Sequence, residues 1–401
     1  MKINVVGGGP GSIELMTVAG ISEIKSADVV LTSLRLNDEF SDLNANIMIM
    51  GIMDTIEYLK ENSDNPNLKV SVLASGDVGF YSIATTLRKN LDHGFQIELI
   101  PGISSFQYFA SKLNMGYEAW KLTSLHGLDR SIVPYASYYN KTFALTGGKW
   151  DVPAIINDLV RVGLGDVKIY VGERLGMQGE KITEDTPKAL VGKAFDKLSV
   201  ILIENENFIN PYMHFKDEDY VRGKAPMTKE HVRNLSVDAL SVGPQDVVWD
   251  VGAGSGGVTC ALALKAHEST VYAVEMKADA LDVLNANVKK LKTYNVEIVS
   301  GRAPDAIVNL PTPTKVFLGG TTGSLEEILD VVLLKNPNAT VVANAITLET
   351  IGSIIEIFKD KNFKTEIISA TIAKSKKLGN YNMMMGENPI YIVKGERDEE
   401  N

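Results

Sequence analysis

The sequence predicts an α/β protein with two parts, an N-terminal part of two lobes and a C-terminal domain with a doubly wound parallel sheet. Apolar runs of strand length alternate with stretches of helix length along most of the 401 residues. Several of the apolar runs end in glycine-rich turns. Ligands collect at the carboxyl ends of parallel strands, so these turns mark candidate sites.

Composition narrows the possible functions. Hydrophobic residues make up 45% and charged residues 22% of the chain, as in ordinary globular proteins. The net charge of −10 argues against nucleic acid as a partner, because phosphate binding needs a basic face. The apolar runs are too short to span a bilayer, and the N-terminus lacks a signal-peptide pattern. We therefore expect a cytoplasmic protein that binds no membrane.

Cysteine and histidine usage predicts neither disulfides nor a metal centre. The single cysteine, Cys260, lies in an expected helix, where a packed thiol is the simplest interpretation. The five histidines are scattered and lack the spacing of metal ligands.

The first half of the chain predicts two lobes, about 1–113 and 114–205. In the first lobe, three expected strands end in glycine-bearing turns at 7–12, 75–81 and 101–105. We expect these turns to share one cleft. In the second lobe, strands are expected at 142–145, 167–171 and 198–203, with a helix at 152–162.

A polar and aromatic segment, 206–225, lacks periodicity and is interpreted as a linker to a domain at 226–401. Thr228 is expected to cap the first helix of that domain. Strands are expected at 246–251, 270–275, 295–299, 314–318, 339–345, 365–373 and 390–394. Helices are expected between the first five strands and after the fifth, at 257–266, 277–291, 303–309, 324–334 and 347–361. The last two strands predict an antiparallel edge.

The turn after the first strand of this domain fits two classes of cofactor. Gly252, Gly254 and Gly257 match G-x-G-x-x-G, which is typical of dinucleotide sites. Glu275 ends the next strand and could hold ribose hydroxyls of either cofactor. Asp250 favours S-adenosylmethionine, because a carboxylate repels a pyrophosphate and attracts an ammonium and a sulfonium. An NAD-dependent oxidoreductase and a non-catalytic sensor of adenosyl ligands stay open as alternatives.

Both halves of the chain resemble known families. Residues 1–205 resemble the tetrapyrrole (precorrin) methylase family through the motifs at 7–11, 75–77, 101–105, 124–127 and 172–176. Residues 226–394 look like the class I methyltransferases that partner this family in cobalamin synthesis, through 226–228, 250–257, Glu275, 301–304, 319–320, 383–385 and 388–389.

The resemblance implies a tetrapyrrole methylase fold followed by a Rossmann-like domain, with one S-adenosylmethionine in each. It also implies methylation of a corrin precursor at carbon 5 by the N-terminal domain and at carbon 15 by the C-terminal domain. Carbon dioxide would be lost from the acetate on carbon 12. The family further implies a homo-oligomer, a dimer or a tetramer.

The resemblance also implies the site residues. The first cofactor site would use Pro10, Gly76, Asp77, Phe80, Ser104, Ser105, Thr146 and Leu175. The second would use Thr228, Gly252, Ala253, Gly254, Ser255, Gly256, Glu275 and Ala303.

Basic side chains should bind the carboxylates of the tetrapyrrole substrate. The main candidates are Arg130, Arg302, Lys374, Lys376 and Lys377; further ones are Arg35, Lys149, Arg174, Arg222 and Arg233. The methionines at 383–385 could form a soft wall for the macrocycle or pack in the core. No catalytic side chain is predicted, because an electron-rich ring carbon needs no protein nucleophile to accept a methyl group.

Overall fold

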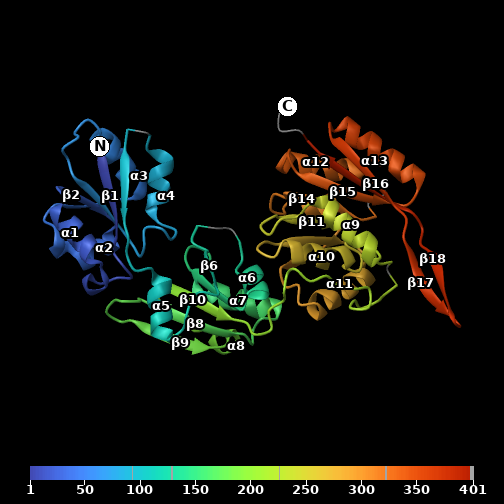
Figure 1. Cartoon of the computed structure of the whole chain (residues 1–401), viewed down its shortest axis with the longest axis horizontal. Helices are drawn as coiled ribbons and strands as arrows, with labels where there is room; N and C mark the ends of the chain where they lie inside the picture. The colour runs from blue at the N-terminus through green and yellow to red at the C-terminus, as the bar shows by residue number, and fades with distance from the viewer. Residues whose placement is uncertain (93, 128–129, 225, 321–322, 398–401) are drawn as a thin grey trace. The chain divides into compact units, whose positions relative to one another are not determined.

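The computed structural model describes residues 1–92, 94–127, 130–224, 226–320 and 323–397 (Figure 1). Ala225, the end of the predicted linker, and 398–401, the end of the predicted C-terminal domain, lie outside these residues. The chain forms two compact units. Unit 1 comprises Met1–Ser131, Asn140–Arg161 and Gly165–Glu206, and unit 2 comprises Ile132–Tyr139, Val162–Leu164 and Asn207–Asn401.

Unit 1 begins with a five-stranded parallel sheet in the order β3-β2-β4-β1-β5. Its strands are β1 (Lys2–Gly7), β2 (Val29–Thr32), β3 (Ile47–Ile49), β4 (Val70–Ala74) and β5 (Gln96–Ile100). The helices of this lobe are α1 (Val18–Ser26), α2 (Leu34–Phe40), α3 (Ile52–Glu61), α4 (Ile83–Asn90) and α5 (Ser105–Leu113). The sequence did not predict α2, β3 or α4. These elements are short, and most of their residues are partly or fully exposed.

The second lobe of unit 1 contains a mixed sheet in the order β6-β7-β10-β8-β9. Only β6 and β7 run parallel among these neighbours. The strands are β6 (Trp120–Ser124), β7 (Lys141–Leu145), β8 (Lys168–Glu173), β9 (Lys181–Asp185) and β10 (Ser199–Glu204). The helices are α7 (Val152–Val162) and α8 (Pro187–Leu190). Two sheets of different type confirm the predicted two-lobed fold.

Unit 2 holds a seven-stranded sheet in the order β13-β12-β11-β14-β15-β19-β16. Its strands are β11 (Val248–Val251), β12 (Val271–Glu275), β13 (Val296–Ser300), β14 (Lys315–Leu318), β15 (Thr340–Ala345), β16 (Lys364–Ala370) and β19 (Ile390–Glu396). Strands β11 to β15 are parallel, and β19 is antiparallel to both β15 and β16. This order confirms the predicted doubly wound sheet with an antiparallel edge.

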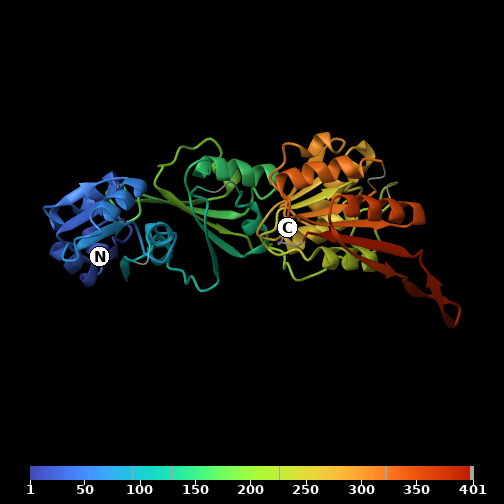
Figure 2. The same ribbon diagram turned by 90° about the horizontal axis from the view of Figure 1, so that it is seen from above.

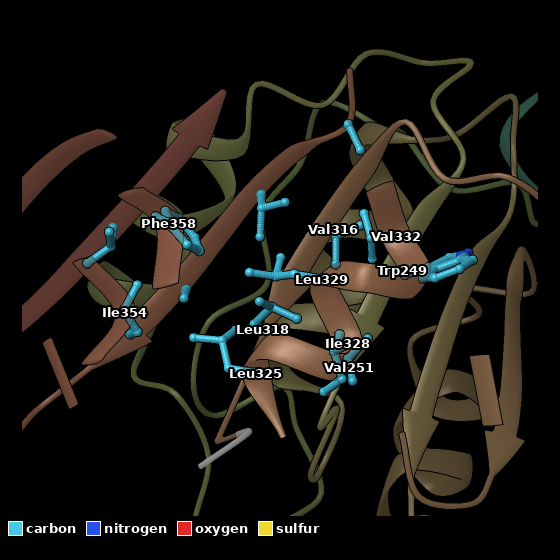
Figure 3. Packing of buried hydrophobic residues seen from close by; sticks show 14 of the residues in the cluster. Trp249, Val251, Val316, Leu318, Leu325, Ile328, Leu329, Val332, Ile354 and Phe358 are labelled. Atoms are coloured by element: carbon cyan, nitrogen blue, oxygen red, sulfur yellow. The ribbon is translucent and has the colours of Figure 1, made fainter. Parts of the chain in front are cut away.

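Helices cover both faces of this sheet, because side chains alternate along each strand. They are α9 (Glu230–Leu240), α10 (Gly257–Lys265), α11 (Ala278–Lys290), α12 (Leu325–Lys335) and α13 (Leu348–Asp360). Trp249 and Val251 of β11 belong to the core with α12 and α13 (Figure 3). Val248 belongs to the core with α9, α10 and α11 on the opposite face. Asp250, next in the alternation, is therefore buried on the α10 side.

Three predictions for unit 2 differ from the structure. Thr228 does not cap the first helix, because the N-cap residue of α9 is Lys229 and no side chain caps this helix. The helix expected at 303–309 is reduced to a 3-10 turn, Asp305–Ile307. Pro311 and Pro313 follow closely, and the residue before a proline disfavours the helical conformation. A hairpin, β17 (Ala373–Leu378) and β18 (Tyr381–Gly386), interrupts the predicted edge between β16 and β19. The sequence did not predict this hairpin, whose two strands are almost wholly exposed.

Two aromatic residues of the segment interpreted as a linker pack against α10 of unit 2, whereas most of its other described residues are exposed. Phe215 and Tyr220 are buried in a cluster with Cys260 and Leu264 of α10. These two side chains supply apolar contacts that the irregular pattern of the segment concealed. Among the described residues, no helix has the length and apolar character needed to cross a membrane.

Candidate functional site

A cavity of about 1100 Å³ lies at the carboxyl ends of the parallel strands of unit 2. The structure places seven of the eight residues predicted for the second cofactor site on its wall. These are Thr228, Gly252, Ala253, Gly254, Ser255, Glu275 and Ala303. Gly256, the eighth, begins α10 behind the wall as its N-cap residue. Arg302, a predicted substrate-binding residue, also lines the cavity.

The glycine at position 252 is required by a close approach of two loops. Gly252 has a φ of +81°, and a Cβ placed on it would lie 1.8 Å from the carbonyl oxygen of Gly319. The loop after β11 therefore passes directly against the loop after β14. Any side chain at this position would force the loops apart and change the shape of the cavity.

Glu275 fixes the glycine loop from the end of β12. Its Oε2 accepts a hydrogen bond from the Gly254 N–H at 2.9 Å. Its Oε1 accepts from the N–H groups of Met276 and Lys277, each at 2.8 Å. The carboxylate is thus oriented by three backbone donors and lies on the cavity wall. A carboxylate held in this way is suited to accept hydrogen bonds from hydroxyl groups of a ligand.

Asp250 lies beneath the glycine loop with its carboxyl group buried. Thr259 of α10 donates a hydrogen bond to Oδ2 at 2.5 Å, and Oδ1 lacks a hydrogen-bond partner in the described structure. Burial raises the pKa of Asp250 to about 7; the Thr259 hydrogen bond lowers the pKa and the negative charge of Glu275 raises it. From the sequence we expected a fixed negative charge at Asp250. Burial favours the neutral carboxyl group, whereas a cationic ligand in the cavity would favour the negatively charged form.

Three cavity-lining residues carry a buried side-chain oxygen without a hydrogen-bond partner in the described structure. They are Asp250, Ser255 and Glu387. Buried polar groups are normally paired, so such a concentration around one cavity indicates groups that a ligand completes. Glu387 was not predicted from the sequence. Its position directly before Asn388-Pro389, one of the motifs that carried the resemblance, is the signal that could have found it.

Arg233 does not bind substrate, contrary to the sequence hypothesis. Its side chain is fully buried and donates to the carbonyl oxygens of Phe215 and Thr228 and to the Asp217 carboxylate. Its guanidinium also lies 4.6 Å from the centre of the Tyr220 ring. Arg233 therefore holds the segment that brings Thr228 to the cavity wall.

The three predicted glycine turns of unit 1 contact one another, as expected. Gly9 and Gly76 form a backbone bridge between the turns after β1 and β4. Asp77 accepts a hydrogen bond from the N–H of Gly102, in the turn after β5, at 3.2 Å. A Cβ on Gly102 would lie 2.5 Å from the Gly76 carbonyl oxygen and 2.7 Å from that of Gly7. Backbone packing at these strand ends therefore excludes a side chain at Gly102.

The remaining residues predicted for the first cofactor site surround these turns. Ser104 caps α5 in a capping box with Gln107, and Ser105 begins this helix. Phe80 packs against the apolar cluster that contains Leu175.

Two further residues tie the turns to neighbouring segments. Pro10 lies beside Gly176, where an added Cβ would be 3.1 Å from its ring. Thr146 follows β7 and donates a hydrogen bond to the Ser199 carbonyl at 2.7 Å.

The other predicted basic residues do not join the described wall of the unit 2 cavity. Lys374, Lys376 and Lys377 lie on β17 and are exposed or nearly so, and Arg130 is exposed in unit 1. The methionines at 383–385 are 51%, 63% and 46% exposed on β18, which rules out core packing within the chain. Cys260 is fully buried, which confirms the expected packed thiol, and this burial raises the pKa of the thiol to about 12.

The substitution Asp250→Asn tests the buried carboxyl. The pKa of Asp250 is about 7 in the folded protein, against an ordinary value of 3.8. Between these two pH values, the folded protein retains a proton that the unfolded chain has released. The wild-type free energy of unfolding should therefore fall, relative to that of the variant, by about 4 kcal/mol between about pH 4 and about pH 7. Urea unfolding of both proteins across this range measures it. A pH-independent difference between them would contradict the burial argument.

Comparison with known proteins identifies a family for each half of the chain. The model of the family "Tetrapyrrole (Corrin/Porphyrin) Methylases" matches residues 2–191, and that of the "Precorrin methyltransferase domain" matches 219–396. A probable cobalt-precorrin-6B C(15)-methyltransferase (decarboxylating) of Methanococcus vannielii is 36% identical over 179 residues, covering 44% of this chain and 97% of the relative.

A longer relative spans both units. The precorrin-6Y C(5,15)-methyltransferase [decarboxylating] of Sinorhizobium sp is 28% identical over 287 residues, covering 70% of this chain and 69% of the relative. A crystal structure of precorrin-6y C5,15-methyltransferase from Geobacter metallireducens GS-15 is 32% identical, with a TM-score of 0.44 over 46% of this chain and 97% of that chain. The chain belongs to the family of decarboxylating precorrin methyltransferases, enzymes that use S-adenosylmethionine, and combines a tetrapyrrole methylase domain with a precorrin methyltransferase domain.

Proposed function

We propose that this enzyme methylates a corrin precursor of cobalamin synthesis at carbon 5 with its N-terminal domain and at carbon 15 with its C-terminal domain. The C-terminal domain also removes carbon dioxide from the acetate on carbon 12. The observation that carries the proposal is the cavity of unit 2, whose wall unites the glycine loop, Glu275 and Arg302. The names of the relatives do not favour an NAD-dependent oxidoreductase or a non-catalytic sensor.

The residues of the cavity fit S-adenosylmethionine, which when bound supplies an electrophilic methyl group. The glycine loop, which Gly252 places directly against Gly319, lines the cavity where the cofactor would lie. Glu275 would accept hydrogen bonds from the ribose hydroxyls, and Asp250 would face the positive charge of the cofactor. Ser255 offers a hydroxyl that lacks a partner in the described structure.

The substrate needs little from the protein beyond orientation. Holding a ring carbon in line with the methyl group can lower the barrier by about 7–11 kcal/mol. Arg302, Lys229 and Lys277 line the cavity and would bind carboxylates of the tetrapyrrole. The three linked turns of unit 1, with Asp77 between two of them, would hold the second cofactor in the same manner.

Paired substitutions test the division of labour. Glu275→Ala should suppress methylation at carbon 15 and the release of carbon dioxide, and Asp77→Ala should suppress methylation at carbon 5 alone. Loss of one hydrogen bond to a charged group weakens binding by about 1.5–3 kcal/mol, so each affected reaction should slow by roughly 10- to 100-fold at limiting cofactor. Mass spectrometry of the product counts the methyl groups and the lost carboxyl.

Glu349→Ala, which replaces a carboxylate of α13 outside the cavity lining, is the matched control and should leave both reactions intact. If Glu275→Ala and Asp77→Ala slow the same methylation, the assignment of one reaction to each domain is wrong.

We further infer that the protein is a homo-oligomer that assembles through the hairpin β17–β18. A two-stranded hairpin in water is at best marginally stable alone, and this one projects beyond the sheet of unit 2 (Figures 1 and 2). The directly opposed pairs Lys376–Met383, Lys374–Met385 and Leu378–Tyr381 share one face. That face is exposed and rich in apolar groups. A second copy of the hairpin would cover it.

Replacing the apolar side chains of that face should weaken the assembly. The variant Met383→Ser/Met385→Ser is expected to lower the molar mass measured by sedimentation at micromolar concentration. Met384→Ser removes the same type of side chain from the opposite face and should leave the mass unchanged. Equal masses for both variants and the parent would show that this face is not the interface.

A further inference from the structure

Glu387 lies on the side of the cavity opposite to the residues expected to hold the nucleoside. Its N–H donates to the Ile372 carbonyl at 2.8 Å, which ties it to the base of the hairpin. It precedes β19, whereas Glu275 ends β12, and the sheet order places β11, β14 and β15 between these strands. Four strand spacings of about 4.8 Å separate β12 from β19 by roughly 19 Å. A ribose on Glu275 is therefore out of reach of Glu387, which faces the half of the cavity left for the methyl acceptor.

The chemistry of that half suits a carboxylate-bearing substrate. Asn344 of β15 and Asn388 both line it and can donate amide N–H groups. Glu387 has one oxygen that is buried without a hydrogen-bond partner in the described structure. Rotation of the terminal carboxyl group exchanges its two oxygens, so the unpaired oxygen can be presented to a ligand.

Decarboxylation also requires a proton, which S-adenosylmethionine does not supply. When the bond between the acetate methylene and its carboxylate breaks, the electron pair stays on the methylene carbon and spreads into the macrocycle. That carbon must then gain a proton to become a methyl group. We propose that Glu387 is the catalytic residue that supplies this proton, an inference that rests on the proposed decarboxylating function.

In this step the carbon–carbon bond breaks, carbon dioxide leaves, and a carbon–hydrogen bond forms with the proton of the Glu387 carboxyl. Glu387 is left as a carboxylate and regains a proton from water. Electrons and atoms balance without an oxidant or a reductant. Asn344 is oriented by Ser236 of α9: its Nδ2 donates to the Ser236 hydroxyl at 2.8 Å, and this hydroxyl lies 3.1 Å from its Oδ1.

The test uses the full chain with cobalt-precorrin-6B and S-adenosylmethionine. Glu387→Gln keeps the shape of the side chain and removes the acid. Release of carbon dioxide should fall by about a hundredfold or more, as expected for a general acid. Methyl transfer to carbon 15 and the affinity for S-adenosylhomocysteine should change less than threefold. Glu387→Asp, which retains the carboxyl group, should recover part of the carbon dioxide release.

Glu366→Gln, an exposed carboxylate of β16 outside the cavity lining, is the matched control and should behave as wild type. Unchanged carbon dioxide release in Glu387→Gln, or an equal loss of release and methyl transfer, would overturn the assignment. A weakened affinity for S-adenosylhomocysteine would overturn it too, since it would place Glu387 at the cofactor. A wild-type chain that transfers no methyl group and releases no carbon dioxide would overturn the proposed function itself and this inference with it.

Discussion

The C-terminal site depends on one close contact between backbones, the passage of Gly252 against the carbonyl oxygen of Gly319. This contact sets the distance between the ends of β11 and β14, the central neighbours of the sheet. It also places the loop where Glu275 can accept the Gly254 N–H. The rest of the cavity follows from the alternation of the strands, which sends Trp249 into one core and Asp250 toward the opposite face, beneath the loop.

In unit 1, close backbone contacts also hold the strand ends together, but in a different arrangement. Three strand ends converge until the backbone of Gly102 lies against Gly7 and Gly76, and Asp77 ties two of the turns together. In both units, a carboxylate near a strand end accepts a hydrogen bond from a backbone N–H group of a neighbouring turn.

The sequence predicted the parts of this design that have a local signal. Strand periodicity and glycine turns predicted the doubly wound sheet, and most residues expected at its cavity line it. Features that depend on burial had no such signal. The raised pKa of Asp250 arises from its burial under α10, and the role of Arg233 arises from contacts with a segment that looked like a linker.

On the acceptor side of the cavity, the sequence signal for Glu387 was its place directly before the Asn388-Pro389 motif. The return of the chain from β18 into β19 brings Glu387 to the cavity wall, and β17 and β18 themselves are almost wholly exposed. The lysines of β17 were predicted to bind substrate because they form a cluster of positive charge. None of them lines the described cavity of unit 2. The tertiary fold decides which charged side chains reach a substrate, and the spacing of these residues along the chain does not reveal their placement.

The central claim is that the two units each bind one molecule of the cofactor. Calorimetric titration of S-adenosylhomocysteine into the whole chain, repeated with Gly252→Val, tests it most directly. The account predicts two sites in the parent and one in the variant, because a side chain at position 252 collides with the Gly319 carbonyl. A single site in the parent, or two sites that survive in Gly252→Val, would contradict it.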